Sequence, residues 1–302
     1  MNCAYEYDRF QGVFVAFYGC YDQSGNISAA QVRRLVKRYK EAGVKGLYLT
    51  GSSGECILQT VEERNRIVEA VMEENAGAMT IIAHTGAATT SDSVALSAFA
   101  SKMRVDAISS IPNVYYQIPE PAIEAHWDRM MEAAELPFII YNIPSTTGYN
   151  LSMSLFRKMI AKDYVMGIKN TTPSSAQINQ YRRAAGERFV IFNGPDNQLL
   201  AGLLMGATGG IGGTYGCMPE LYVKLYAAYE KGDYALAMDW QNRINAIIDM
   251  MQQFPYTTGL SVARSIAQAR GMEIGAVRAP ILPVEAEDPA IQKAAGMIEG
   301  WL

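Results

Sequence analysis

Short apolar runs alternate with amphipathic stretches through most of this chain, and this alternation limits the fold more than any other sequence feature. Eight such runs occur, each four or five residues long. Near-continuous apolarity over so few residues is typical of parallel strands that are buried on both faces. The runs are 13–17, 46–49, 79–82, 105–108, 137–141, 164–168, 189–192 and 207–211.

The segments between these runs carry helix signals. Ser28-x-x-Gln31, Thr60-x-x-Glu63 and Ser174-x-x-Gln177 each have the spacing of a capping box, which predicts a helix start. Eight strands that alternate with helices predict an α/β fold of the (β/α)8 type, the TIM barrel. A doubly wound parallel sheet is the alternative, because periodicity alone does not show that a sheet closes.

The strand signals stop after Tyr215. Segments 219–231, 234–253 and 257–270 predict helices, and a tail through 278–283 follows them. We therefore expect a barrel that carries the active site over residues 1–215 and a helical C-terminal region over residues 216–302. No low-complexity linker separates the two parts.

Charge and composition exclude several classes of partner. The formal net charge of −4 lacks the basic excess of proteins that bind nucleic acid or anionic membranes. No apolar run reaches the roughly 18 residues of a membrane-spanning helix. Residues 1–8 are polar and acidic, unlike a signal peptide. We expect a soluble, cytoplasmic protein that has neither a nucleic-acid nor a membrane partner.

Metal-ligating and thiol chemistry find little support. The chain has two histidines, His84 and His126, and neither has a ligand-like neighbour, so we expect no metal site and no Ser-His-Asp triad. We expect His84 to face a cleft and His126 to lie on a helix surface. The scattered cysteines form no CxxC pair and are expected to be reduced. They are Cys3, Cys20, Cys56 and Cys217.

Two polar residues at strand ends are the strongest candidates for chemistry, because the active site of a parallel barrel forms where its strands end. Lys169 follows the sixth run. Burial there disfavours an ammonium ion and frees an amine that can attack a carbonyl. The alternative is a lysine that extends to solvent. Tyr141 ends the fifth run and can exchange a proton with a substrate, or else serve as a core tyrosine.

Two glycine-rich segments also follow strands. In Gly51-Ser-Ser-Gly-Glu55, Ser52 and Ser53 can bring hydroxyls and backbone N–H groups together on a carboxylate, although a plain turn is the alternative. No Gly-Lys-Ser/Thr follows, so this is not a P-loop. The segment 206–213 is rich in glycine, but no βαβ unit follows it as in a dinucleotide site. A site in this segment that binds the phosphate of a phosphorylated substrate is a further alternative.

Taken in order, these motifs resemble those of the N-acetylneuraminate lyase and dihydrodipicolinate synthase superfamily of class I aldolases. The resemblance extends over essentially the whole chain. The family's GS/TTGE turn, YNxP strand end, Schiff-base lysine strand, two later loops and C-terminal signature have counterparts here. These are Gly51-Ser-Ser-Gly-Glu55, Tyr141-Asn-Ile-Pro144, Gly167-Ile-Lys169, Asn193-Gly-x-Asp196, Gly209-Gly-Ile-Gly212 and Arg278-x-Pro-x-x-Pro283.

The resemblance implies a mechanism. Lys169 would form an iminium with the C2 ketone of a 2-keto acid. Tyr141 would accept the C4 hydroxyl proton as the C3–C4 bond breaks and leaves the enamine of pyruvate. Ser52 would link Tyr141 to a second tyrosine from an adjacent subunit, Tyr116 or Tyr115. A homotetramer is therefore implied.

The resemblance also implies how the substrate is bound. Ser53 and the N–H groups of its turn would hold the carboxylate. No metal or organic cofactor is needed, because the lysine supplies the electron sink. The remaining substrate-binding residues would be Thr171, Gly194, Asp196, Asn197, Gly212 and Gly213.

Three positions indicate which branch of the superfamily this chain is nearer. Thr146 stands where the synthases carry an arginine for a second carboxylate, which disfavours dihydrodipicolinate synthesis. The lyases' Asp-Glu pair is Asp196-Asn197 here, and Gly213 replaces a serine, which weakens binding of a polyol chain.

We expect a Schiff-base lyase that splits N-acetylneuraminate into pyruvate and N-acetylmannosamine. Another 2-keto-3-deoxy sugar acid is the nearest alternative substrate. A synthase-like condensation of pyruvate with an aldehyde is a further alternative reaction. A non-enzymatic 2-keto-acid sensor is the alternative from a different class of protein.

Overall fold

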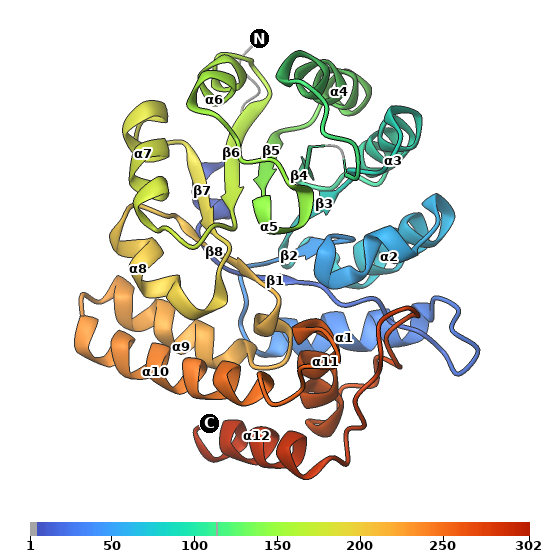
Figure 1. The fold of residues 1–302 in the computed structure, drawn as a ribbon, viewed down its shortest axis with the longest axis vertical. Coiled ribbons are helices and arrows are strands. Elements are labelled where there is room, and N and C mark those ends of the chain that lie inside the picture. Colours follow the sequence, from blue (N-terminus) through green and yellow to red (C-terminus); the bar gives the residue numbers. More distant parts are fainter. Residues whose placement is uncertain (1–4, 113) are drawn as a thin grey trace.

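The eight strands form one closed, parallel barrel in sequence order (Figure 1). The computed structural model describes residues 5–112 and 114–302, so Cys3 lies outside the described residues. Pairing of the last strand with the first closes the sheet. The strands are β1 (Gly12–Ala16), β2 (Gly46–Leu49), β3 (Thr80–His84), β4 (Ala107–Ser110), β5 (Phe138–Asn142), β6 (Val165–Asn170), β7 (Val190–Asn193) and β8 (Gly209–Gly212). Closure confirms the TIM barrel and excludes the doubly wound sheet.

Helices surround the barrel, each following a strand (Figure 1). The α-helices of this ring are α1 (Ala29–Glu41), α2 (Val61–Asn75), α3 (Thr90–Lys102), α4 (Glu120–Ala134), α5 (Pro144–Thr147), α6 (Met153–Ile160), α7 (Ala176–Ala185), α8 (Leu199–Leu204) and α9 (Pro219–Glu230). Single turns of 3-10 helix are η1 (Tyr7–Phe10), η2 (Ser52–Gly54), η3 (Cys56–Leu58), η4 (Asp196–Gln198) and η5 (Thr214–Gly216).

Capping residues fix two helix starts as predicted. At α2, the Thr60 hydroxyl accepts from the N–H of Glu63, and the Glu63 carboxylate accepts from the N–H of Thr60. This is a complete capping box, which satisfies two otherwise free N–H groups. At α1, the Ser28 hydroxyl accepts from the N–H of Gln31. Both helices therefore begin where the sequence places them.

The start predicted for α7 is wrong. The residue before this helix is Ser175, whose side chain makes no capping hydrogen bond. The Gln177 side chain cannot complete a box with Ser174, because it accepts from the Thr172 hydroxyl at 2.8 Å. The predicted helix is therefore present as α7, but it starts one residue after the expected position and without the capping box.

The apolar core has two layers, which make the strand ends a rigid platform. One cluster fills the barrel interior and includes Phe14, Ile82, Ile139 and Phe192. The larger cluster lies between the barrel and the helices. Since side chains pack the interior, the barrel has no channel, and ligands are restricted to its mouth.

The C-terminal region lies on one side of the barrel (Figure 1). Helix α9 contacts β1, and α10 (Tyr234–Met251) and α11 (Gly259–Ala269) follow it. Helix α12 (Pro289–Gly300) is not among the predicted helices, although Asp288 caps it and Ile291 and Ile298 form part of its buried face. The division into 1–215 and 216–302 stays a prediction that limited proteolysis can test.

Both histidines are buried, and for His126 this corrects the expected position on a helix surface. His126 is 5% exposed, and its Nδ1 lies 2.9 Å from the Thr90 hydroxyl, so it packs α4 against α3 and not toward solvent. Burial lowers the pKa of His126. His84 ends β3 inside the barrel and is fully enclosed. Cys20, Cys56 and Cys217 are free thiols in buried positions.

Membrane insertion has no support from the helices. In the part of the chain that the structure describes, none of them combines the length and the apolarity needed to cross a bilayer.

Candidate active site

Lys169 lies inside the barrel mouth, beside the end of the neighbouring strand. The register of β5 and β6 places it opposite Tyr141. Its residue is 5% exposed, and its Nζ lies 3.9 Å from the ring centroid of Tyr141 and 4.5 Å from that of Tyr48. This arrangement contradicts the alternative of a lysine that extends to solvent. The amine therefore faces two aromatic rings inside the barrel mouth.

Tyr48 is a part of the site that sequence reasoning missed. Its ring stands edge-on to Tyr141 at 5.9 Å between centroids. Its hydroxyl donates to Ser109 at 3.0 Å, and Ser109 donates to the carbonyl of Ile139 at 2.7 Å. Burial raises the pKa of Tyr48 well above its usual value, so it stays neutral. The only sequence signal was a tyrosine within an apolar strand, which is also typical of ordinary core.

His84 supports the same cluster from β3. Its ring stands edge-on to Tyr141 at 6.1 Å. Burial and the charge of Arg64 lower the pKa of His84 well below its usual value, so the ring is neutral. Its Nδ1 lies 3.0 Å from the carbonyl of Thr50, and the N–H of Ile111 donates to its Nε2 at 3.4 Å. The Thr50 carbonyl can only accept, and at 3.0 Å it lies closer to Nδ1 than Arg64 Nη2 does at 3.4 Å, so these partners favour the Nδ1–H tautomer.

The serine-containing turn follows β2. Thr50 and Glu55, which flank it, have left-handed φ values of 50° and 61°, a conformation that non-glycine residues seldom adopt. Ser52 is exposed, whereas Ser53 is partly buried and lines a cavity. Within the described part of the chain, no hydrogen bond joins the hydroxyls of Ser52 and Tyr141. The turn lies against Tyr48 through Gly51, and it is not linked to Tyr141 through Ser52 among the described residues of one chain.

Two glycines at strand ends leave room for polar side chains. A methyl group at Gly194 would overlap the hydroxyl of Thr171, and one at Gly212 would overlap the carboxylate of Asp196. Both positions lie at the carboxyl end of the barrel, after β7 and at the end of β8. Only glycine keeps Thr171 and Asp196 in their observed places.

Asp196 and Thr171 present polar atoms without partners. Asp196 Oδ2 accepts from the N–H of Thr214 at 2.9 Å. Its Oδ1 and the Oγ1 of Thr171 are shielded from solvent and have no hydrogen-bond partner among the described residues. Burial raises the pKa of Asp196 above its usual value. Buried polar atoms without partners are costly, so a ligand that supplies hydroxyl donors would be stabilised here.

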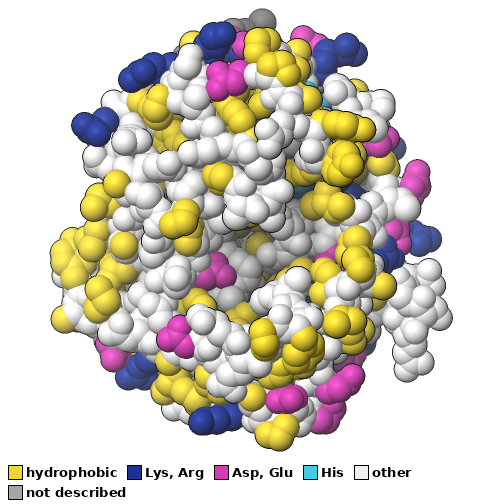
Figure 2. Space-filling view, viewed as in Figure 1, with side chains coloured by type: hydrophobic (Ala, Val, Ile, Leu, Met, Phe, Trp, Pro, Cys, Tyr) yellow, Lys and Arg dark blue, Asp and Glu magenta, His cyan; other side chains and the backbone are white. Residues whose placement is uncertain are grey.

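A cavity of about 460 Å³ lies beside Asp196, and Thr171, Lys169 and Tyr141 are not among its lining residues. Ser53, Asp196 and Gly213 line its barrel side. Figure 2 shows that this face of the molecule is hollowed near its middle. The opposite wall comes from α10, α11 and the loop between them, and sequence reasoning missed it. It is mainly apolar and includes Ile248, Met251, Phe254, Leu260 and Ala263.

Residues 9–295 match the dihydrodipicolinate synthetase family. The chain belongs to this family. It is 42% identical over 96% of its length to the N-acetylneuraminate lyase of Mediterraneibacter gnavus, 93% of which is covered. It is 34% identical to N-acetylneuraminate lyase 2 of Escherichia coli O6:H1, with 83% of each chain covered.

Solved structures agree with this kinship. The catalytic lysine mutant of Ruminococcus gnavus sialic acid aldolase superposes with a TM-score of 0.95 at 40% identity, with 98% of each chain covered. The expected resemblance is confirmed, on the N-acetylneuraminate lyase side of the dihydrodipicolinate synthetase family. Like these relatives, the chain is a lyase of the class I aldolase type.

Three positions that separate the family's branches are exposed or lack a side chain. Thr146 is exposed and donates to the carbonyl of Ile143 within its own turn, so no guanidinium occupies its position. Asn197 is exposed next to the cavity-lining Asp196. A side-chain Cβ at Gly213 would lie 2.9 Å from the hydroxyl of Ser53. Of the Asp196-Asn197 pair, only Asp196 lines the cavity.

The two candidate second tyrosines lie away from Lys169 in a single chain. Tyr115 and Tyr116 are 90% and 71% exposed, and their rings contact each other at 5.0 Å. Tyr116 lines a separate cavity of about 350 Å³, together with Gly148 and Tyr149 after α5. One protomer of this family member thus brings Lys169, Tyr141 and the serine turn together, but not Tyr115 or Tyr116.

Proposed function

We propose that this enzyme reversibly cleaves N-acetylneuraminate to pyruvate and N-acetylmannosamine through a Schiff base on Lys169. The observation that carries the proposal is the buried Lys169 amine against the rings of Tyr141 and Tyr48, near the carboxyl ends of the paired strands β5 and β6. The 42% identity to an N-acetylneuraminate lyase supports the choice of substrate.

The chemistry begins on the lysine. The Nζ lone pair of Lys169 attacks the C2 ketone, and loss of water gives an iminium. The C3–C4 bonding pair then moves toward the iminium nitrogen, which forms an enamine, while Tyr141 accepts the C4 hydroxyl proton and the aldehyde leaves. Protonation of the enamine at C3, followed by addition of water at C2, releases pyruvate and restores the amine.

Binding groups surround this centre. Ser53 and the N–H groups of its turn hold the carboxylate, with Gly213 leaving room beside the Ser53 hydroxyl. Thr171 and Asp196 offer their unpaired oxygens to hydroxyl donors of the substrate, while Gly194 and Gly212 make space for these side chains. Asn197 stands at the rim. These assignments need no metal ion or organic cofactor.

A second subunit completes the proposed proton relay. Ser52 is exposed at the mouth, and Tyr116 and Tyr115 are exposed on another loop. Exposed aromatic residues are typical of interfaces. We propose that Ser52 connects Tyr141 to Tyr116 or Tyr115 of a neighbouring subunit in a homotetramer. Sedimentation that shows a fully active monomer would overturn this part.

Particular residues bear on the alternative substrate, the synthase reaction and the sensor. The missing carboxylate at Asn197 and missing hydroxyl at Gly213 favour a shorter 2-keto-3-deoxy sugar acid as the second candidate. Thr146 disfavours a synthase reaction. A sensor would have no use for a lysine and a tyrosine in contact. The buried free thiols support a reducing compartment, and we propose a cytoplasmic location.

The proposal is tested by pyruvate release from N-acetylneuraminate, with Lys169→Met as the inactive control. Methionine has a similar length and no amine. We expect release by the wild-type enzyme, equimolar N-acetylmannosamine, and none from the variant. Turnover retained by Lys169→Met would overturn the assigned nucleophile. If the wild-type enzyme cleaves only a shorter 2-keto-3-deoxy acid, the assigned substrate is wrong and the Schiff-base mechanism is retained.

A further inference from the structure

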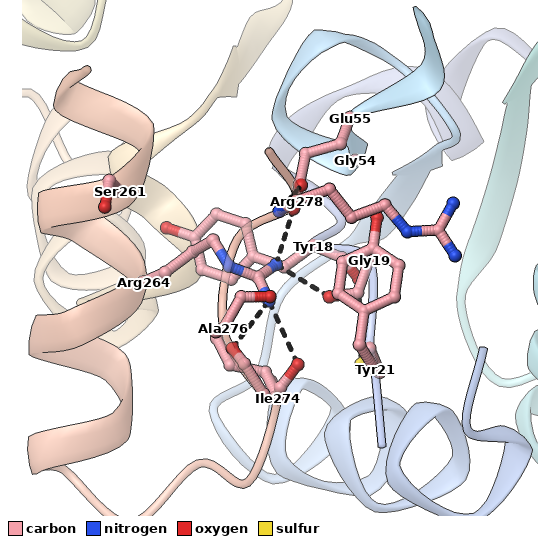
Figure 3. A network of polar contacts seen from close by, with 12 residues as sticks. Tyr18, Gly19, Tyr21, Gly54, Glu55, Ser261, Arg264, Ile274, Ala276 and Arg278 are labelled. Carbon is pink, nitrogen blue, oxygen red and sulfur yellow. Dashed lines mark hydrogen bonds and ion pairs between the residues drawn. The ribbon is translucent and has the colours of Figure 1, made fainter. Parts of the chain in front are cut away.

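A buried ion pair joins the serine turn to the C-terminal region. Glu55 ends this turn, and its Oε1 lies 3.2 Å from Nη1 of Arg264 on α11. The two side chains are 0% and 1% exposed. Figure 3 shows the Arg264 side chain reaching from α11 across to Glu55. Two segments far apart in the sequence are thus locked together beside the cavity.

The guanidinium of Arg264 is itself firmly held. It donates to the carbonyls of Gly19 at 2.6 Å, Ile274 at 3.0 Å and Gly275 at 2.8 Å. The rings of Tyr18 and Tyr21 lie 5.8 and 5.5 Å from it. Figure 3 shows these two tyrosines together with Arg264. With this many partners the guanidinium has a fixed position, from which it can fix Glu55.

Glu55 is hydrogen-bonded through one carboxylate oxygen, while the other lies at ion-pair distance from Arg264 without a hydrogen-bond partner among the described residues. Its Oε2 accepts from the backbone N–H of Arg278 at 2.8 Å, in addition to the Oε1 contact with Arg264. Its backbone has the left-handed φ of 61°, which a non-glycine residue keeps only where its surroundings impose it. The side-chain contacts therefore hold the end of the turn in an otherwise unfavourable conformation.

The same pair sets the spacing of two cavity walls. Ser53 lies two residues before Glu55 and lines the barrel side of the cavity. Leu260 and Ala263, on the helix that carries Arg264, line the opposite side. A buried ion pair is not by itself a source of stability, since its desolvation offsets its attraction. Here the ion pair instead sets the position of the serine turn relative to α11.

We propose that Glu55 and Arg264 are positioning residues for the carboxylate site. They hold Ser53 and the N–H groups of its turn at the place where the carboxylate of a 2-keto acid lies when its ketone meets Lys169. This inference rests on the proposed Schiff-base function. It predicts a defect that is specific to substrates with a carboxylate.

The test compares two ketones in a borohydride trap, pyruvate and acetone, which differ by the carboxylate. For Glu55→Gln we expect the pyruvate concentration for half-maximal trapping to rise about 10-fold or more, as for a weakened bond to a charged group. Trapping by acetone should stay unchanged. The control is Glu73→Gln, which loses an exposed ion pair with Arg33, away from Glu55, and should leave both ketones unaffected.

The outcomes separate the explanations. Equal losses for pyruvate and acetone would show a general structural role and overturn the proposal, as would unchanged pyruvate trapping. No pyruvate adduct in the wild-type enzyme would instead refute the proposed function. If Glu55→Gln does not fold, the double variant Glu55→Gln/Arg264→Gln, which buries no unpaired charge, is judged by the same criterion.

Discussion

Replacing Asp196 with asparagine isolates the group that we assign to the far end of the sugar acid. Asp196→Asn keeps the size of the side chain. The amide oxygen can still accept from the N–H of Thr214, as Oδ2 does at 2.9 Å. An NH2 group then takes the place of the unpaired Oδ1, and it cannot accept a hydrogen bond from a substrate hydroxyl.

The size of the effect follows from that lost acceptor. A hydrogen bond to a charged group contributes about 1.5–3 kcal/mol, so kcat/KM for N-acetylneuraminate should fall about 10- to 100-fold. Pyruvate has no hydroxyl tail, so its trapping on the lysine should be unchanged. Burial raises the pKa of Asp196, which means the folded state disfavours its charge. The variant should therefore melt no lower than the wild-type enzyme.

The assay is coupled pyruvate release beside borohydride trapping and a thermal melt. Asp239→Asn is a matched control, because Asp239 lies on α10 in an exposed pair with Arg243. Unchanged kcat/KM in Asp196→Asn would refute the assigned contact. An equal loss in pyruvate trapping would show that the residue acts on the whole mouth and not on the tail.

Three further predictions address other parts of the account. Tyr141→Phe should lower kcat for cleavage about 100-fold or more while pyruvate is still trapped, and unchanged turnover would remove its role in proton transfer. Gly194→Ala should cost about 1–3 kcal/mol of folding free energy and lower kcat/KM, since the added methyl overlaps Thr171; an unaltered melt and activity would contradict this. Arg278 lowers the pKa of Glu63 below its ordinary 4.5, so the pair's stabilisation is complete above that pH and is lost as pH falls through the lowered value. Glu63→Gln should flatten the acid side of the melting profile, and an unchanged profile would argue against the pair.

Much of the fold could be predicted because burial on both faces leaves a direct mark in the sequence. Each parallel strand had to be an apolar run, and the observed strands overlap all eight runs. Closure could not be predicted, because the pairing of β1 with β8 joins distant segments. Helix α12 was missed, although Ile291 and Ile298 are one face of a helix that Asp288 caps.

The site was predictable where a polar residue interrupts an apolar strand. Lys169 and Tyr141 stood out for that reason, and the structure places them in contact. His84 was expected to face a cleft, and its ring stands edge-on to Tyr141. Tyr48 did not stand out, because a ring within a buried strand has the same pattern whether it packs in the core or contacts the lysine amine. The pairing of Glu55 with Arg264 left no local signal, since only the folded chain brings them together.

The central claim is that the Lys169 amine forms an imine with a 2-keto acid. Its most direct test is reduction with borohydride in the presence of pyruvate, followed by intact mass and peptide mapping. We predict one reduced pyruvate adduct per chain, located on Lys169. An adduct on another lysine, or none in a folded and fully reduced sample, would contradict the account.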